Sequence, residues 1–300
     1  MVDISTQINS LSLPNPTMLA SGIMDEDAGS MLRVLESGAG AVVTKSIGQV
    51  QRKGHPNPTF VELDCGILNA MGLPNPGIDE YITELKELKK QNGIIIGSVF
   101  GSNAEEFTEV AFKMNAYVNA LELNFSCPHA EGYGLEIGQN PKFVSEITSS
   151  VVNAVSVPVY VKLSAQVNDI ASIATAAEEA GANAIVAINT LKAMSINLEV
   201  KKPILGNKTG GYSGKAIKPI GVKAVYDLYD HLSIPIIGVG GVETGLDAIE
   251  YILAGASSVQ IGTAVYTRGI MVFDRICNEI TKWMESHNVQ SISDLIGVAH

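Results

Sequence analysis

Short apolar runs rich in β-branched residues alternate along the chain with longer segments of helical period. Eight such runs stand at residues 16–22, 40–46, 93–100, 120–127, 158–164, 184–190, 235–242 and 258–265. Segments between them, such as residues 78–91, 141–155 and 170–182, repeat apolar residues every three to four positions. Parallel strands joined by crossover helices give this alternation. Eight strand–helix units in 300 residues predict an α/β fold, a (β/α)8 TIM barrel.

The alternative fold is an open doubly wound sheet. Residues 21–24, Ser-Gly-Ile-Met, lack the glycine fingerprint that such a sheet usually carries after its first strand. No linker or shift in composition divides the chain, so we predict a single domain over residues 1–300. Two long connections, residues 47–79 and 192–220, interrupt the regular rhythm. We expect the first to contain short strands, so that these long loops cover the C-terminal mouth of the barrel.

Composition narrows the class of protein. The chain is 46% hydrophobic and 17% charged, which favours a substantial core over disorder. It has 20 Lys and Arg against 31 Asp and Glu, a net charge of −11, and no basic run, so a nucleic-acid partner is not expected. The N-terminus has no signal-peptide pattern and no window is apolar enough for a membrane span, so we expect a soluble, cytoplasmic protein with no membrane partner.

Polar residues gather at the predicted C-terminal ends of the strands, where TIM barrels carry their reactive groups. Taken singly, each such residue is explained by a helix cap or a solvated side chain. Together, they would leave several polar groups facing one another across a barrel mouth without a ligand. These strand-end residues are Ser21, Lys45, Ser46, Ser98, Asn124, Cys127, Lys162, Ser164, Asn189 and Thr190.

The last two strands end in glycine. Gly240 and Gly241 follow the seventh run, and Gly262 with Thr263 follows the eighth. Barrels commonly bind phosphate at these two loops, because glycine lets backbone N–H groups approach the phosphate oxygens. A single glycine here is explained equally well by a tight turn. The pair of glycine-rich ends favours a phosphate-bearing ligand.

The three cysteines are odd in number, widely spaced and free of any CxxC motif. This pattern argues against disulfides, a zinc site or an iron–sulfur cluster bound by this chain alone, so no metal ligand is assigned and a reducing compartment is expected. We interpret Cys65 and Cys277 as buried hydrophobic residues. Cys127 begins a glycine-rich loop after a strand-end Asn, and a thiol there suits a base or nucleophile, with His129 as a possible orienting group.

Several motifs in this order strongly resemble the class 1 dihydroorotate dehydrogenases: LPNPTMLASG, VVTKSIG, RKGHPNP, ILNAMGLPNPG, ELNFSCP, PVYVKLS, AINT, NKTGGYSGKAIKP, GVGGV and IGTAV. The likeness is greatest to the catalytic subunit of subclass 1B. That resemblance implies oxidation of dihydroorotate to orotate in de novo pyrimidine (UMP) biosynthesis. It also implies a partner subunit that carries FAD and a [2Fe-2S] cluster and passes electrons to NAD⁺, in a heterotetramer built around a homodimer.

The resemblance also implies the residues of the site. Cys127 would take the C5 proton of dihydroorotate while FMN takes the C6 hydride, and Lys162 would stabilise the negative charge of the reduced flavin. The implied FMN contacts are Ser21, Lys45, Ser46, Asn124, Lys162, Ile188, Gly214, Gly240, Gly241, Gly262 and Thr263. The implied substrate contacts are Lys45, Asn69, Ala70, Met71, Gly72, Leu73, Asn124, Asn189 and Thr190.

The chain departs from the family's pattern at two positions, and two alternative functions stay open. Many members of the family carry Asn where this chain has Ser98 and His129. The CPH sequence and the later GQNP also resemble dihydropyrimidine dehydrogenases, although Lys45 suits a substrate that carries a carboxylate. A different class is a flavin-free barrel lyase in which Lys162 forms a Schiff base with a phosphorylated substrate. No residue decides between NAD⁺ and fumarate as the electron acceptor.

Overall fold

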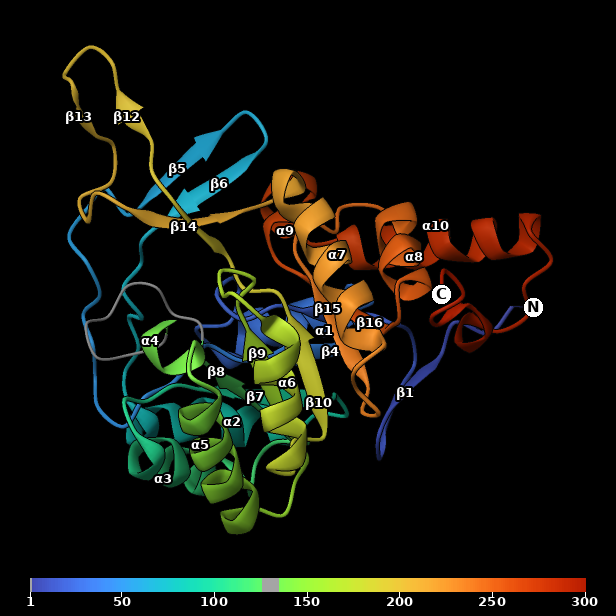
Figure 1. Cartoon of the computed structure of the whole chain (residues 1–300), viewed down its shortest axis with the longest axis horizontal. Helices are drawn as coiled ribbons and strands as arrows, with labels where there is room; N and C mark the ends of the chain where they lie inside the picture. Colours follow the sequence, from blue (N-terminus) through green and yellow to red (C-terminus); the bar gives the residue numbers. More distant parts are fainter. Residues whose placement is uncertain (1, 126–134) are drawn as a thin grey trace.

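A closed barrel of eight parallel strands forms the centre of the molecule (Figure 1). The structure, a computed structural model, describes residues 2–125 and 135–300. Around the barrel the strand order is β10-β15-β16-β3-β4-β7-β8-β9. In chain order these strands are β3 (Thr17–Leu19), β4 (Ala41–Val43), β7 (Ile95–Val99), β8 (Ala120–Asn124), β9 (Val159–Leu163), β10 (Ala184–Ala187), β15 (Ile236–Val239) and β16 (Ala256–Ile261). The predicted TIM barrel is therefore confirmed.

Seven of the eight predicted runs contain one barrel strand, and the eighth, 258–265, overlaps β16, which begins two residues earlier; every strand is shorter than its run. Some polar ends of the runs lie beyond the barrel strands, as Lys45 and Ser46 do after β4, whereas Asn124 and Lys162 pair with each other in the ladder of β8 and β9. The run 120–127 ends in residues outside the described part of the chain. The sequence thus predicts the positions of the strands better than their ends.

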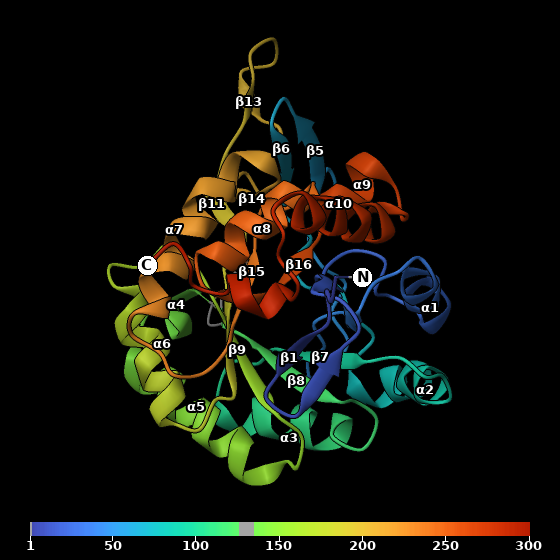
Figure 2. The same cartoon turned by 90° about the vertical axis from the view of Figure 1, so that its right-hand side faces the viewer.

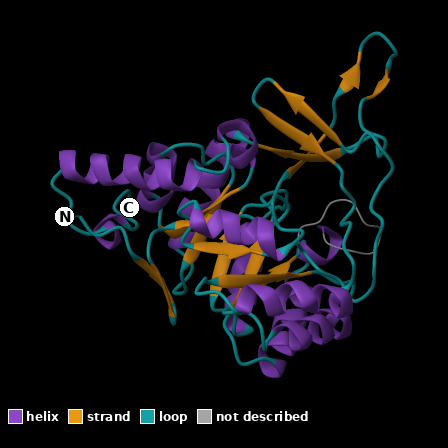
Figure 3. Ribbon diagram, turned by 180° about the vertical axis from the view of Figure 1, so that it is seen from behind, coloured by secondary structure: helices purple, strands orange, loops and turns teal. Residues whose placement is uncertain are grey.

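Helices surround the barrel (Figures 2 and 3). Several of them begin at a side-chain cap: Asp27, Asn103 and Asp169 each accept a hydrogen bond from a backbone N–H of the first turn. The longer helices are α1 (Ala28–Glu36), α2 (Ile78–Lys89), α3 (Ala104–Met114), α5 (Pro141–Ala154), α6 (Ile170–Glu179), α7 (Lys218–Tyr229), α8 (Gly245–Leu253) and α10 (Val272–Ser286). The shorter ones are α4 (Leu135–Gly138), α9 (Thr263–Arg268) and the 3-10 turns η1 (Lys215–Ile217) and η2 (Ile292–Leu295). None of the helices in the described residues is long and apolar enough to cross a membrane.

A hairpin covers the N-terminal end of the barrel. Its strands, β1 (Thr6–Ile8) and β2 (Leu11–Leu13), pair antiparallel. Ile8 and Leu13 are buried in the same apolar cluster as barrel residues such as Val43, Tyr160 and Ile237. The hairpin therefore closes the barrel interior from below, and it leaves the opposite mouth for a ligand.

The two long connections fold together above that opposite mouth. The first carries β5 (Phe60–Leu63) and β6 (Gly66–Asn69), which confirms the expected short strands. The second carries β11 (Leu191–Ala193) and β14 (Gly210–Ser213), which complete an antiparallel sheet of order β11-β14-β6-β5. A further hairpin projects from it, formed by β12 (Ile196–Asn197) and β13 (Lys202–Pro203) (Figure 1). That both connections share one sheet was not predicted.

The buried side chain of Asn75 holds the first connection in place. Its Oδ1 accepts hydrogen bonds from the N–H groups of Gly77 (2.9 Å) and Gly48 (3.3 Å), and its Nδ2 donates to the carbonyl of Leu73 (2.9 Å). A side-chain amide that satisfies three backbone groups fixes a loop which otherwise has little regular structure. The segment of residues 69–73 is thereby held at the barrel mouth.

Candidate active site

A cavity of about 420 Å³ opens at the C-terminal ends of the barrel strands, beneath the small sheet. Strand ends from around the barrel form its lower wall, and Phe60, Ile67 and Ser213 of the small sheet form part of its upper wall. Every residue predicted to bind FMN lines this cavity. So do most residues predicted to bind substrate: Lys45, Asn69, Met71, Gly72, Leu73, Asn124, Asn189 and Thr190.

Ala70 is the described substrate candidate that does not line the cavity. Its side chain is fully buried with Leu68 and Leu205 in the core of the small sheet. Side chains on a strand alternate between the two faces, so Ala70 points away from its neighbours Asn69 and Met71. Its side chain therefore supports the loop.

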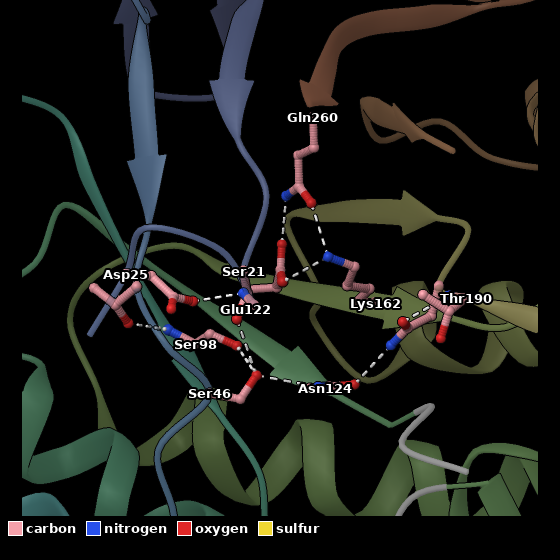
Figure 4. A network of polar contacts seen from close by, with 12 residues as sticks. Ser21, Asp25, Ser46, Ser98, Glu122, Asn124, Lys162, Thr190 and Gln260 are labelled. Atoms are coloured by element: carbon pink, nitrogen blue, oxygen red, sulfur yellow. Dashed lines mark hydrogen bonds and ion pairs between the residues drawn. The ribbon is translucent and has the colours of Figure 1, made fainter. Parts of the chain in front are cut away.

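A chain of hydrogen bonds crosses the cavity from β3 to β10 (Figure 4). Ser46 is its centre: its Oγ lies 3.1 Å from Ser21 Oγ, 2.8 Å from Ser98 Oγ and 3.1 Å from Asn124 Nδ2, which donates to it. Asn189 Nδ2 in turn donates to Asn124 Oδ1 at 3.1 Å. These contacts orient two carboxamides and three hydroxyls at one wall. Ser98, which is fully buried, contributes to the same network.

Lys162 and Gln260 form the floor of the cavity, and the buried Glu122 lies beneath them. Lys162 Nζ lies 3.2 Å from Glu122 Oε1 and 2.8 Å from Gln260 Oε1, and Gln260 Nε2 donates to Glu122 Oε2 at 2.5 Å (Figure 4). Lys162 was predicted from the sequence, whereas Glu122 and Gln260 were missed. A pattern in the sequence could have indicated them. Glu122 in ALELN (120–124) and Gln260 in SSVQI (257–261) are polar residues within predicted strands, and alternate residues of a barrel strand point into the barrel.

Asp25 is a second residue that the sequence did not single out. It lines the cavity and is 1% exposed, and its Oδ2 accepts a 2.5 Å hydrogen bond from the Gly22 N–H. Burial raises the pKa of the Asp25 carboxyl, although the nearby positive charge of Lys45 and the Gly22 hydrogen bond oppose the rise. Lys45 Nζ also pairs with the exposed Glu26 at 3.2 Å. The Lys45 ammonium thus stands among carboxylates at one side of the cavity.

Replacing Asp25 with Asn should change how stability depends on pH. The folded-state pKa of Asp25 is raised, so between its unfolded value of about 3.9 and that raised value the folded protein binds more protons. The free energy of unfolding of the wild type therefore falls as the pH rises through this window. Asparagine does not titrate, so the Asp25→Asn variant does not lose stability in this way, and its side-chain oxygen still accepts a hydrogen bond from Gly22. Urea unfolding from pH 4 to pH 7 should show that the free energy of unfolding of Asp25→Asn increases relative to that of the wild type as the pH rises. Parallel stability curves would contradict the assignment.

The glycine-rich strand ends form a wall without side chains. Gly240 and Gly241 have φ values of +125° and +68°, and a Cβ at Gly241 would lie 2.8 Å from the Gly214 carbonyl. Gly262 is the N-cap residue of α9, and no side chain caps that helix. Thr263 Oγ1 donates to Ser213 Oγ at 2.8 Å, which joins this wall to the small sheet. A bare backbone beside an uncapped helix start fits the phosphate of a ligand such as FMN.

Tyr251 supports this wall from below. Its buried hydroxyl donates to the carbonyl of Gly240 at 2.8 Å and to that of Val239 at 3.3 Å. We expect Tyr251→Phe to lower stability by about 1–2 kcal/mol, because the buried Gly240 carbonyl loses its donor, and to weaken FMN binding. Urea unfolding and FMN titration measure the two effects. Tyr226→Phe, which removes the same atom from an exposed residue, is the control and should change neither.

The three cysteines differ in what the structure says of them. Cys127 and the neighbouring His129 lie outside the described residues, so their predicted roles remain predictions. Cys65 is exposed, contrary to the prediction that it is buried, because it lies in the turn between β5 and β6. Burial raises the pKa of the Cys277 thiol to about 11, which agrees with an inert side chain. Among the described residues, no three His, Cys, Asp or Glu side chains gather closely enough to hold a metal ion.

The fold and the cavity define a TIM barrel with a polar-lined cavity at its C-terminal mouth. A sequence model described as dihydroorotate dehydrogenase matches residues 3–284, nearly the whole chain. The chain therefore belongs to the dihydroorotate dehydrogenase family.

Similar proteins agree with this membership. The chain is 51% identical over 301 residues to a protein of Methanocaldococcus jannaschii, with 99% of this chain and 98% of the relative covered. It is 49% identical to one of Thermoplasma acidophilum (100% and 99% covered) and 48% identical to one of Pyrococcus horikoshii (99% and 97%). Each is named dihydroorotate dehydrogenase B (NAD(+)), catalytic subunit. A solved structure of DHODH from Eimeria tenella in complex with ferulenol has a TM-score of 0.88 at 24% identity, covering 99% of this chain and 89% of that one, and shares the fold.

Proposed function

We propose that this chain oxidises dihydroorotate to orotate, as the catalytic subunit of an NAD⁺-linked dihydroorotate dehydrogenase. The observation that carries the proposal is the convergence of two lysines and three asparagines on one cavity: Lys45, Lys162, Asn69, Asn124 and Asn189. A planar substrate that bears amides and a carboxylate needs such donors and acceptors at its edges. This step belongs to pyrimidine biosynthesis.

FMN is the proposed cofactor, and the cavity fits it. The side-chain-free wall of Gly240, Gly241 and Gly262 suits the phosphate, and Lys162 on the floor suits the part of the flavin that becomes negative on reduction. The bound flavin would supply the hydride acceptor for C6 of the substrate. Further proposed contacts are Ser21, Lys45, Ser46, Asn124, Ile188, Gly214 and Thr263.

Substrate binding is assigned to the wall formed by the carboxamides and to the segment 69–73. Asn124 and Asn189 are linked by a 3.1 Å hydrogen bond, so their orientations depend on each other and present a fixed set of polar atoms. Lys45 would attract the substrate carboxylate, which dihydrouracil lacks. The anchoring of this segment supports the role, because β6 holds it at Asn69 and the Asn75 amide holds it at the Leu73 carbonyl.

Cys127 is the proposed base that removes the C5 proton. Its place in the chain, three residues after the cavity residue Asn124, supports the proposal. An unperturbed cysteine thiol has a pKa of about 8.5, and a group of this kind suits proton removal at neutral or mildly alkaline pH.

The electron acceptor and the partner are proposed from the names of the relatives. They are named as NAD⁺-dependent catalytic subunits, which supports a second subunit that transfers electrons. We assign to that partner FAD and a [2Fe-2S] cluster, in a heterotetramer around a homodimer in the cytoplasm. The absence of a cysteine cluster in the sequence supports assigning the iron–sulfur centre to another chain.

An anaerobic titration of the purified, FMN-loaded protein with dihydroorotate tests the proposal. Loss of the oxidised-flavin absorbance with dihydroorotate, and none with dihydrouracil, is the expected result. A yellow protein that is bleached only by dihydrouracil would favour a dihydropyrimidine dehydrogenase-like activity. A protein that takes up no FMN but yields a borohydride-trapped adduct on Lys162 would instead support the flavin-free lyase.

A further inference from the structure

The lysine on the cavity floor is held from two opposite sides of the barrel. Glu122 lies on β8 and Gln260 on β16, and in the strand order these two strands are four positions apart in a ring of eight. Lys162 comes from β9, next to β8. The three side chains meet across the barrel interior, above the apolar layer to which Ala120 and Tyr160 of the same strands belong.

The hydrogen-bonding roles of Lys162 and Glu122 leave one orientation for the Gln260 amide between them. A lysine ammonium only donates and an ionised carboxylate only accepts, so the amide of Gln260 must turn its oxygen to Lys162 and its nitrogen to Glu122. The distances agree with this arrangement: 2.8 Å for the first contact, 2.5 Å for the second, and 3.2 Å between Lys162 and Glu122. An amide can bridge the two, whereas a carboxylate or an alkyl side chain cannot.

Glu122, Gln260 and Lys162 are all buried, so the charges of Glu122 and Lys162 act strongly on a ligand in the cavity. Glu122 is 0% exposed, Gln260 1% and Lys162 5%, so water screens these groups little. The carboxylate and the ammonium together are neutral, and of the three residues Lys162 and Gln260 line the cavity while Glu122 does not. The negative charge therefore stays below the floor and the positive charge faces the ligand.

We propose that Glu122 and Gln260 are positioning residues that hold the Lys162 ammonium at the cavity floor and thereby set the reduction potential of the bound flavin. This inference rests on the proposed function for the identity of the ligand. Within it, Gln260 fixes the direction of the lysine, and Glu122 balances its charge from the side away from the ligand.

An exchange of carboxylate and amide tests the proposal. Glu122→Gln leaves a net positive floor, so it should favour the reduced, anionic flavin, whereas Gln260→Glu gives a net negative floor and should disfavour it. Each shift should be roughly tenfold in the redox equilibrium, or about 30 mV for a two-electron couple. The double variant Glu122→Gln/Gln260→Glu restores one carboxylate, one amide and neutrality, so its potential should return toward that of the wild type.

The potentials are measured by reductive titration with dithionite and a reference dye at about pH 8, where carboxyl groups are ordinarily ionised. This readout needs no dihydroorotate, so failure of the proposed substrate would leave it intact. Ser258→Ala is the matched control: Ser258 precedes Gln260 by two residues on β16, and its buried hydroxyl has no hydrogen-bond partner among the described residues. It should not shift the potential.

Urea unfolding of the same variants without flavin gives an independent readout. Both single variants should be destabilised, and the exchange variant should recover part of the loss, a non-additive result that two unrelated sites would not give. Three results would each overturn the proposal. Both single variants could lower the potential, the exchange variant could keep the potential of Gln260→Glu, or the exchange variant could fail to fold.

Discussion

Replacing Lys162 with Met is expected to destabilise the protein by roughly 3–5 kcal/mol and to abolish flavin reduction by dihydroorotate. The stability loss arises because the Glu122 carboxylate, 0% exposed, loses its counter-ion at 3.2 Å and keeps the uncharged Gln260 amide as a hydrogen-bond donor. The loss of reduction arises because the proposed stabiliser of the reduced flavin is gone. Urea unfolding and stopped-flow absorbance measure the two effects separately.

The double variant Lys162→Met/Glu122→Met separates these two causes. Because it removes the buried carboxylate together with its partner, it should recover most of the lost stability. It should not recover flavin reduction, since no positive charge returns to the cavity floor. A double variant as unstable as Lys162→Met alone would mean that the ion pair does not explain the loss.

Replacing Cys127 with Ser should slow flavin reduction by roughly 10²–10⁴-fold while FMN stays bound. A serine hydroxyl is a far weaker acid than a thiol, so little of it is ionised at neutral pH to accept the C5 proton. Rapid mixing of the oxidised variant with dihydroorotate under anaerobic conditions gives the rate, and the flavin spectrum gives the cofactor content.

Cys65→Ser and Cys277→Ser are the matched controls, since they make the same change at an exposed turn and at a half-buried position. Both should reduce their flavin at the wild-type rate. Were Cys127→Ser also to do so at neutral pH, another group would have to be the base.

The barrel was predictable from the sequence because its strands are buried on both faces. Strands β8 and β9 are buried at every position, so they appear in the sequence as short, nearly continuous apolar runs. The polar residues just beyond these runs were predictable too, since all parallel strands end at the same mouth. Lys45 and Asn189 were found in this way, and both line the cavity.

Contacts across the barrel were not predictable from the sequence. The pairing of Glu122 with Lys162 and Gln260 depends on which strands face each other once the barrel has closed, and no local pattern encodes that. Asp25 was missed for a related reason: it stands beside Asp27, which caps α1, and only the folded loop separates the buried carboxyl from the exposed one. Ala70 was assigned to the substrate with its loop, although its side chain packs into the core of the small sheet.

The hairpin of β1 and β2 has a kinetic consequence. It seals the barrel below the cavity, at the opposite end of the molecule from the small sheet (Figure 1). Two ligands that share the cavity must then enter and leave through the same mouth. Whichever lies deeper has to be loaded first and released last. A cofactor at the lysine floor would therefore be trapped by the substrate above it, and turnover would proceed by exchange of the outer ligand alone.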